Sequence, residues 1–320
     1  MVLRKIDNNL CPENPLVSVL IPVFNGESFV AEALDSVLVQ THRNLEIIVL
    51  DDGSSDSSPQ IIRDHAARDP RLRLVSPPSN GFANVLNHGL EIAQGELIAR
   101  LDADDVMEPG RIETQVSVMR EDPDLVLCAS HVIYIDESGA RRGTGQASYH
   151  SPDEVVVAAE VNDVIGFHHP SVMFRKEAVV EAGGYRLGMW PVEDVDLWTR
   201  MVEAGARMRV IDEPLTRYRI HGGSGSRALD SVRKLDWIKA CARARRAGTD
   251  EPTWDEFQVP ESGVLRAVNR ERKTYGKYLY RRAVQYWTLR SYPAAMVMLG
   301  CSFVLMPSHL VKKARKVKFR

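Results

Sequence analysis

Two clusters of carboxylates are the residues of this sequence best suited to chemistry. Each cluster follows a short apolar run, and the five acids are Asp51, Asp52, Asp102, Asp104 and Asp105. Carboxylate oxygens repel a bare phosphate but bind hard divalent cations, so the D-x-D-D spacing of the second cluster predicts a Mg²⁺ or Mn²⁺ site. Acids at strand ends are also ordinary helix caps and turn formers, but two clusters together favour a site.

The pair formed by Asp51 and Asp52 has a second use. A carboxylate accepts hydrogen bonds from the N–H groups of a base and from ribose hydroxyls. A nucleoside diphosphate bridged by a divalent cation would therefore engage both clusters.

The elements that must position these acids follow an α/β pattern. Short β-branched runs at 17–23, 45–50, 72–75 and 96–101 alternate with helical spacing, which predicts βαβ units and a parallel sheet. In an open parallel sheet, ligands bind outside the carboxyl ends of the strands. Both acidic clusters follow strands, so the pattern brings them to one crevice.

Beyond Pro109 the rhythm changes. The pattern predicts a helix to about residue 120, a strand at 125–135, a helix opened by Ser151, an extended segment at 167–174, a helix at 195–204 and strands at 207–220. We place a domain boundary after Ser226, which gives a catalytic domain at 1–226 and a basic, mainly helical region at 227–320.

Four segments resemble the family 2 glycosyltransferases with a GT-A fold. They are VSVLIPVFNGESFVAEALDSVLVQTHRNLEIIVLDDGSSD, SNGFANVLNHGLEIAQGELIARLDADD, HHPSVMFRKEAVVEAGGYR and PVEDVDLWTRM, and they follow the family's order between residues 17 and 226. The resemblance implies a Rossmann-like, mostly parallel sheet flanked by helices. It also implies an inverting transfer of a sugar from a nucleotide diphosphate sugar, with uridine as the base, to a hydroxyl of a saccharide or lipid-linked saccharide acceptor, as in cell-surface polysaccharide synthesis.

The resemblance also assigns roles to residues. The nucleotide-binding residues would be Pro22, Val23, Asn25, Asp51, Asp52 and Asp102. Asp104 would bind the metal directly, with Asp105 beside it, and Asp194 would be the catalytic base. The chemistry agrees, because an inverting displacement needs one carboxylate to take the acceptor proton and a positive group to stabilise the departing diphosphate.

Further candidates have equally good structural explanations. On the acceptor or donor-sugar side they are Glu193, His169, Trp190 and Arg100, and His221, which opens the glycine-rich segment 221–226, is a candidate for the metal or diphosphate. Glu193 could simply be an acid at a helix start, where acids are favoured. His169 and Trp190 stand beside apolar residues and could be buried for packing. The segment 221–226 could equally be a solvated connector. Many relatives carry a basic residue where this chain has 81–87, so phosphate neutralisation here would rest more on the metal.

Charge separates the two parts of the chain. Residues 1–226 carry 20 basic and 35 acidic side chains, whereas residues 227–320 carry 21 basic and 8 acidic ones. The apolar stretch 293–306 is shorter than the roughly 20 residues of a spanning helix, and basic residues follow it. This pattern suits peripheral contact with an anionic membrane, or equally a helix packed on the body before a solvated tail. The acidic body and the absence of a reader motif argue against nucleic acid.

The remaining sequence features concern location and alternatives. Four dispersed cysteines and no apolar run in residues 1–10 lead us to expect a cytoplasmic protein, located peripherally at the inner face of the cytoplasmic membrane if the basic region binds lipid. A sugar nucleotidyltransferase would share the sheet and metal site, but no G-x-G-x-R loop follows the first strand. A non-catalytic nucleotide-sugar or carbohydrate binding protein is the other alternative, and the full set of acids speaks against it.

Overall fold

The computed structural model describes residues 12–77, 81–146, 149–221, 228–259 and 264–307. The chain divides into two compact units, the first made of residues 1–135 and 144–219 and the second of 136–143 and 220–320. We call them the sheet unit and the helical unit and describe each by itself. The expected boundary at residue 226 falls in 222–227, outside the described residues.

One half of the sheet is parallel, as the alternating pattern predicts. Its strands are β1 (Val17–Val23), β2 (Leu45–Asp51), β3 (Leu72–Val75) and β4 (Leu97–Arg100). In register, Val17 pairs with Leu45 on one side and Leu97 on the other. The carboxyl ends of β1, β2 and β4 therefore lie at one edge of the sheet, where both acidic clusters begin.

The other half of the sheet is mixed. Its strands are β5 (Val106–Met107), β6 (Leu125–Ile135), β8 (Met173–Arg175) and β9 (Arg207–Arg219). The order across the sheet is β3-β2-β1-β4-β8-β6-β9-β5, with β8 antiparallel to both β4 and β6, and β9 parallel to β6. The extended segment expected at 167–174 is instead a 3-10 turn (His169–Ser171) followed by β8.

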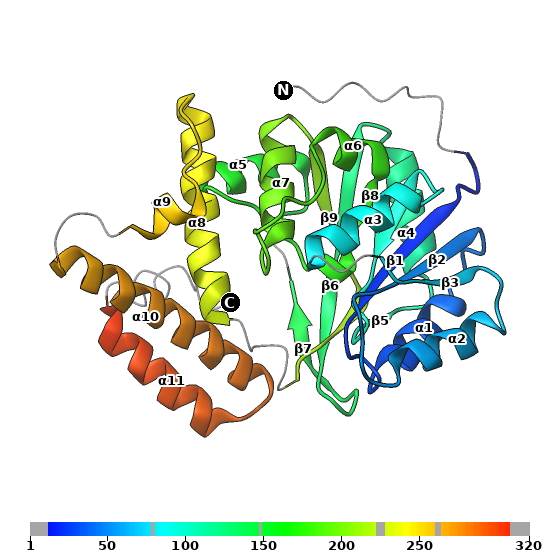
Figure 1. Cartoon of the computed structure of the whole chain (residues 1–320), viewed down its shortest axis with the longest axis horizontal. Coiled ribbons are helices and arrows are strands. Elements are labelled where there is room, and N and C mark those ends of the chain that lie inside the picture. The colour runs from blue at the N-terminus through cyan, green and yellow to red at the C-terminus, as the bar shows by residue number, and fades with distance from the viewer. Residues whose placement is uncertain (1–11, 78–80, 147–148, 222–227, 260–263, 308–320) are drawn as a thin grey trace. The chain divides into compact units, whose positions relative to one another are not determined.

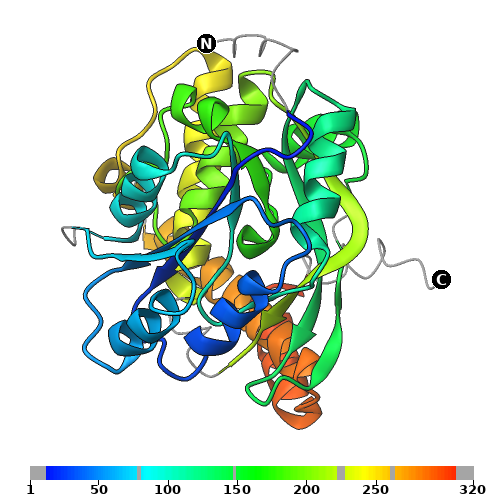
Figure 2. The same cartoon turned by 90° about the vertical axis from the view of Figure 1, so that its right-hand side faces the viewer.

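Helices cover both faces of the sheet (Figure 1). They are α1 (Val30–Leu38), α2 (Ser58–Ala66), α3 (Phe82–Ile92), α4 (Arg111–Glu121), α5 (Pro152–Asn162), α6 (Lys176–Glu181) and α7 (Glu193–Glu203). Successive residues of a strand face opposite sides. Val19 and Ile21 accordingly join a core with α1, α2 and α4, whereas Leu20 joins a core with α3, α5, α6 and α7. Figure 2 turns the elements from β1 to α3 toward the viewer.

The helical unit contains four helices in the described part of the chain. They are α8 (Ala228–Ala247), α9 (Trp254–Gln258), α10 (Val264–Thr288) and α11 (Tyr292–Leu305), and β7 (Arg141–Gly145) falls at the unit's sequence boundary. α10 packs against α8 and α11, and the α8–α10 contact includes the ion pair of Lys277 Nζ with Asp236 Oδ2 at 2.6 Å. Among the described residues no helix combines the length and apolarity that a membrane crossing requires. The basic tail at 312–320 lies outside the described residues.

Candidate active site

The acids after β4 form a compact cluster. Ligand oxygens of Asp102, Asp104 and Asp105 all lie within 4.8 Å of one another. Burial raises the pKa of Asp102, and the nearby Asp104 raises it further, against the lowering effect of Arg100. Burial, followed by Asp104 and Asp102, holds the pKa of Asp105 well above its usual range. Three crowded carboxylates with hard oxygen ligands suit a divalent cation, which would relieve this repulsion.

Arg100, the last residue of β4, is the buried cation of the site. Its side chain is 2% exposed, and its Nη1 lies 2.7 Å from Asp102 Oδ1. Burial alone would lower the pKa of this guanidinium, but Asp102 and then Tyr185 and Glu193 raise it above its ordinary value. Arg100 thus lies in the electrostatic field of acids from two separate segments of the chain.

The end of β9 holds the acidic cluster in place. The backbone N–H of Arg219 donates to Asp105 Oδ1 at 2.7 Å, and Arg219 Nε donates to the carbonyl of Asp104 at 2.7 Å. Its Nη2 reaches Glu32 Oε2 of α1 at 2.5 Å, and the guanidinium lies 4.6 Å from the ring centre of Phe29. Asp105 Oδ2 is buried with no hydrogen-bond partner in the described part of the chain. This unpartnered carboxylate oxygen is available as a ligand for a cation.

Hydrogen bonds join the loop after β1 to the loop after β2, and we call the two the tied loops. The backbone N–H of Asn25 donates to Ser54 Oγ at 2.9 Å, and Asn25 Oδ1 accepts from the N–H of Ser55 at 2.8 Å. Asn25 has φ of 51°, a conformation in which asparagine is among the more tolerant residues. The N–H of Gly26 donates to Ser58 Oγ at 2.8 Å, so Ser58 links the loops rather than capping α2.

These ties place the predicted nucleotide residues side by side. Pro22 and Val23 at the end of β1 pair with Leu50 and Asp51 of β2, and the N–H of Asp52 donates to the carbonyl of Val23 at 2.9 Å. Asp51 is buried and accepts from the N–H of Ser54 at 3.1 Å, which is a turn-forming contact. Asp52 is less buried than Asp51. The structure brings this set together at the sheet edge that also carries Asp102.

Glu193 and Asp194 open α7. Burial raises the pKa of Asp194 to about 6, although a backbone hydrogen bond and Arg100 act in the opposite direction. Burial and the charge of Asp194 raise the pKa of Glu193 to about 8, and Glu193 Oε2 has no hydrogen-bond partner among the described residues. Near neutral pH the pair therefore holds one ionised carboxylate and one protonated carboxyl, an arrangement suited to a general base.

His169, Tyr185 and Trp198 form an aromatic cluster near the site. His169 Nε2 is 2.9 Å from the hydroxyl of Tyr185, and its ring centre is 6.0 Å from that of Trp198. Burial, followed by the nearby Arg100, holds the pKa of His169 well below its usual range, so the ring is neutral. These contacts support the structural explanation of His169, and its contact with an acceptor stays a prediction. Trp190, in the loop before α7, is partly buried and its role also stays a prediction.

Sequence reasoning missed how deeply the supporting residues are buried. Arg111, the first residue of α4, is fully buried and donates to the carbonyls of Pro170 at 2.5 Å and Arg100 at 2.9 Å. The side-chain amide of Asn87, on α3, donates to the carbonyl of Tyr185 and accepts from its N–H. His221 belongs to the helical unit, so its contribution to the metal stays a prediction, and 222–226 lies outside the described residues.

Comparison with known families connects this geometry to an activity. The model described as "Glycosyl transferase family 2" matches residues 18–183, which is more than half of the 320 residues. The chain belongs to this family. The match contains both carboxylate clusters and ends before α7.

Relatives of this family 2 glycosyltransferase include bacterial proteins. The protein of Bacillus subtilis (strain 168) that bears the name glycosyltransferase EpsE is 34% identical over 209 residues, which cover 64% of this chain and 73% of that protein. Chondroitin synthase of Escherichia coli is 28% identical over 233 residues, which cover 73% of this chain and 32% of the synthase. The chain therefore matches only about a third of that larger protein.

Solved structures show the same fold. Staphylococcus aureus TarS 1-349 in complex with UDP-GlcNAc superposes with a TM-score of 0.59 at 16% identity, covering 92% of each chain. The mannosyltransferase PcManGT of Pyrobaculum calidifontis, in complex with GDP-Man and Mn²⁺, gives 0.53 at 20% identity, covering 96% of this chain and 81% of that one. The expected GT-A fold, with a helical C-terminal part, is thereby confirmed.

Proposed function

We propose that this family 2 glycosyltransferase moves a sugar, with inversion, from a nucleotide diphosphate sugar to a hydroxyl of a saccharide or lipid-linked saccharide acceptor. The observation that carries the proposal is Arg100, a buried cation 2.7 Å from Asp102 of the acidic cluster, whose positive charge also lowers the pKa of Glu193 and of Asp194 at the start of α7. A donor-side acid and a candidate base therefore share one electrostatic environment.

The donor side would be formed by the tied loops and the acidic cluster. Asp52 would accept hydrogen bonds from the base, and Pro22, Val23, Asn25 and Asp51 would line the nucleotide site. The structures of TarS with UDP-GlcNAc and of PcManGT with GDP-Man support a nucleotide sugar as donor. A uridine base follows the resemblance drawn from the sequence.

The metal would be Mg²⁺ or Mn²⁺. Asp104 and Asp102 would hold it, and the unpartnered Oδ2 of Asp105 completes a set of close oxygen ligands. A bound divalent cation would supply positive charge to stabilise the departing diphosphate. The Mn²⁺ in the PcManGT complex supports this choice.

Asp194 would act as the general base. It takes the proton from the acceptor hydroxyl while the new C–O bond forms and the bond from the anomeric carbon to the diphosphate oxygen breaks. Glu193, protonated near neutral pH, adds no second negative charge beside it. The nucleoside diphosphate leaves from the opposite face of the sugar, which inverts the anomeric carbon.

The names of the relatives support a class of acceptor. Chondroitin synthase builds a polysaccharide, as its name says, and supports a role in polysaccharide biosynthesis. For this chain we propose cell-surface polysaccharide synthesis, in the cytoplasm at the inner face of the membrane. The donor sugar and linkage depend on side chains that contact the two sugars, in loops such as 184–192.

A screen of nucleotide sugars with candidate saccharide acceptors tests the proposal. Release of nucleoside diphosphate that requires donor, Mn²⁺ or Mg²⁺ and acceptor together is the expected result, and NMR of the product should show an inverted anomeric carbon. Release of pyrophosphate from a sugar phosphate and a nucleoside triphosphate would indicate a nucleotidyltransferase instead. Tight nucleotide-sugar binding without turnover across the screen would indicate a binding protein.

A further inference from the structure

The helix α11 exposes large apolar side chains instead of burying them. Its sequence, YPAAMVMLGCSFVL, contains no charged residue, and only Ala295 and Ser302 of its residues are buried. Ser302 Oγ donates to the carbonyl of Gly276 on α10 at 2.8 Å. A Cβ at Gly276 would come within 2.6 Å of Met306 Cγ, so the contact between the two helices depends on small residues. A helix that is apolar all round is normally covered on every side.

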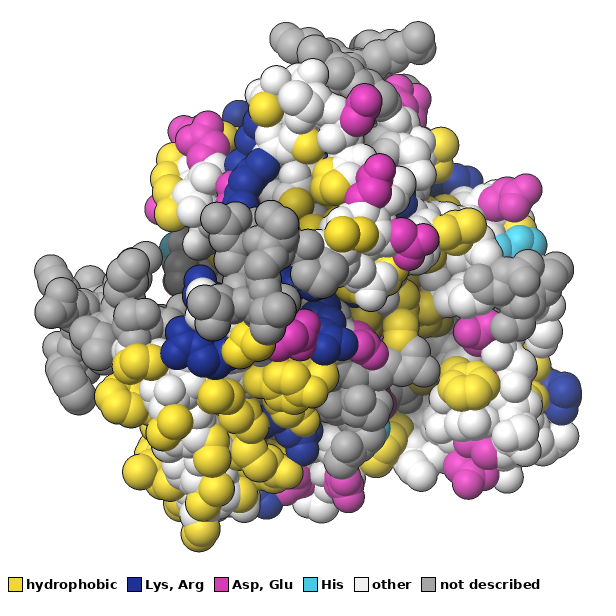
Figure 3. Space-filling model, turned by 60° about the vertical axis from the view of Figure 1, so that its left-hand side comes forward, with side chains coloured by type: hydrophobic (Ala, Val, Ile, Leu, Met, Phe, Trp, Pro, Cys, Tyr) yellow, Lys and Arg dark blue, Asp and Glu magenta, His cyan; other side chains and the backbone are white. Residues whose placement is uncertain are grey.

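The exposed side of this hairpin forms one apolar surface. Its members on α11 and at the α10–α11 turn are Trp287 (56% exposed), Tyr292 (47%), Met296 (57%), Val297 (64%), Phe303 (51%) and Val304 (76%). We call this set the hairpin face. The rings of Trp287 and Tyr292 meet edge to face at 5.1 Å. Figure 3 shows the hydrophobic side chains gathered over this part of the helical unit, with Lys and Arg side chains and some Asp and Glu side chains beside them.

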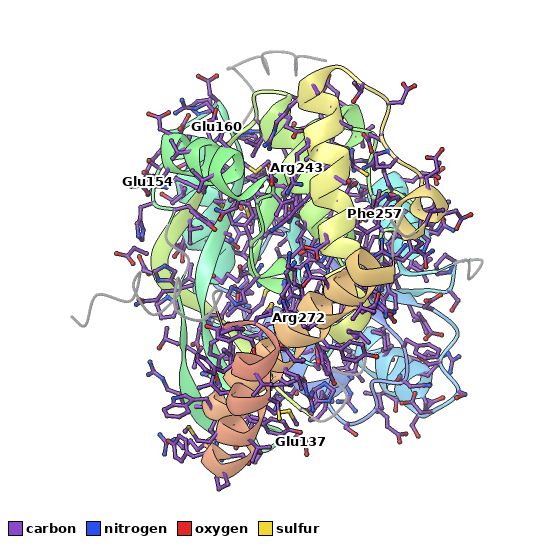
Figure 4. All side chains as sticks on the ribbon, turned by 90° about the vertical axis from the view of Figure 1, so that its left-hand side faces the viewer. Glu137, Glu154, Glu160, Arg243, Phe257 and Arg272 are labelled. Atoms are coloured by element: carbon purple, nitrogen blue, oxygen red, sulfur yellow. The ribbon has the colours of Figure 1, made fainter. Side chains whose placement is uncertain are left out.

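The charge around the hairpin face indicates what covers it. The region 227–320 carries 21 basic and 8 acidic side chains. On α10 the exposed cations include Arg272, labelled in Figure 4, and Lys273, and Arg290 is exposed at the turn. The acid of α10, Glu271, is paired with Arg233 of α8 at 2.9 Å. A surface that is apolar, aromatic at one end and flanked by cations complements anionic lipid.

The helix α11 is too short to cross a bilayer, but it is long enough to lie on its surface. Its 14 residues extend about 21 Å at 1.5 Å per residue, short of the roughly 30 Å hydrocarbon core. Tryptophan and tyrosine prefer the boundary between headgroups and acyl chains. We propose that the hairpin face docks the helical unit flat on an anionic bilayer, with α11 at the headgroup boundary. This inference is independent of the sugar transfer proposed above.

Flotation of the full chain with vesicles tests the docking. We expect binding to vesicles of phosphatidylcholine with 30% phosphatidylglycerol, and much weaker binding to pure phosphatidylcholine. The double substitution Val297→Glu with Val304→Glu should weaken binding at least about tenfold, because two charges enter the apolar contact. Arg272→Gln and Lys273→Gln should each weaken it about fivefold, since a cation near anionic lipid contributes about 1 kcal/mol.

A matched control uses exposed valines of the sheet unit. Val157 and Val161 on α5 are 57% and 69% exposed, so Val157→Glu with Val161→Glu adds the same charges at a surface outside the hairpin face. This variant should lose no more binding than its added negative charge explains. Circular dichroism and thermal unfolding establish that the variants are folded. Brominated acyl chains should quench tryptophan fluorescence, and Trp287→Phe should remove much of that quenching.

Three results would overturn the proposal. The first is a failure of the unchanged chain to float with anionic vesicles at low salt. The second is equal binding by the Val297→Glu, Val304→Glu variant and the α5 control. The third is a stable dimer, measured by light scattering, that the hairpin variant converts to monomer without any vesicle binding, since a second copy would then cover the face. None of these measurements uses sugar transfer, so the outcome is separable from the proposed activity.

Discussion

Arg100 Nη1 lies 2.7 Å from Asp102 Oδ1, and the arginine side chain is 2% exposed. Asp102 keeps 31% of its side chain exposed, so the buried partner of this ion pair is the arginine, whose charge is compensated by the aspartate. Arg100 also sits over the ring of Phe82, 5.6 Å from its centre. The pair therefore fixes the first acid of the cluster to the end of β4.

Replacement of Arg100 should be damaging in two measurable ways. For Arg100→Met we expect a loss of about 1–3 kcal/mol of stability, because the partly exposed Asp102 loses its charged partner and its pKa rises further. Metal-dependent donor binding should also weaken. Thermal unfolding and calorimetric titration with Mn²⁺ and nucleotide measure the two effects, and Arg100→Lys, which keeps the charge, should be milder. Wild-type stability in Arg100→Met would contradict a structural role for the pair.

Asp194→Asn tests the base directly. We expect turnover to fall by about 10² to 10⁴, because the amide cannot take the acceptor proton. Nucleotide binding should stay close to that of the unchanged chain, since Asp194 belongs to α7 and not to the loops that carry the predicted nucleotide residues. Glu203→Gln, at the far end of the same helix and exposed, is the matched control and should keep full activity. A fully active Asp194→Asn variant would remove this residue from the role.

The raised pKa of Asp194 predicts an acidic limb in the rate profile. With a pKa of about 6, the carboxylate is ionised above that pH and protonated below it, so turnover should decline as pH falls through about 6. A profile of kcat/KM between pH 5 and 9 measures the limb. An acidic limb centred near the ordinary value for an aspartate would show that burial does not perturb this residue in solution.

Glu193 predicts a separate effect on stability. Its pKa in the folded chain, about 8, is above the ordinary value of 4.5, so folding favours the protonated form. The stability from this group is fully present below the unfolded pKa and is lost as pH rises through about 8. The contribution of Glu193 to the Tm of the unchanged chain should thus fall as pH rises from about 4.5 to about 8 and level off above that, and Glu193→Gln should flatten that fall. Parallel melting curves for the two chains would count against a buried, neutral Glu193.

A glycine behind the site makes a further prediction. Gly184 has φ of +64°, and an added Cβ would lie 2.8 Å from Asn87 Oδ1, the oxygen that accepts from the N–H of Tyr185. Gly188→Ala is the matched control, because its φ is +77° but nothing lies within 4 Å of the added Cβ. Left-handed strain alone costs about 1 kcal/mol, and displacement of Asn87 adds to it in Gly184→Ala. Chemical denaturation should therefore rank Gly184→Ala below Gly188→Ala.

Local patterns predicted the part of the fold that depends on neighbours in sequence. The runs 17–23 and 45–50 became β1 and β2, since a strand buried on both faces shows as a continuous β-branched segment, and the run 72–75 became the partly buried edge strand β3. The placement of Asp51 and Asp102 at the same edge of the sheet followed from the rule that parallel strands end at one edge. Family resemblance supplied Asp194, whose surroundings look locally like any helix start.

Contacts between distant segments escaped sequence reasoning. Arg219 bonds Asp105, which is 114 positions earlier, because β9 pairs with β5, the strand that follows the acids. No local pattern distinguishes it from the other arginines of 207–219. The full burial of Arg111 had the same origin, since its partners beyond Gln115 of its own helix are backbone carbonyls of residues 100, 170 and 172. Such positions become visible only when the strand order is known.

The hydrogen bond from Arg219 to Asp105 has a consequence for the construction of chimaeras. Arg219 is the last residue of the sheet unit, and the helical unit begins at Ile220. A graft that exchanges the C-terminal region should therefore keep Arg219 with the N-terminal partner. A junction placed only a few residues earlier would remove the hydrogen bonds that Arg219 makes to Asp104 and Asp105. A chimaera that is inactive for this reason could be misread as one whose two parts have incompatible specificities.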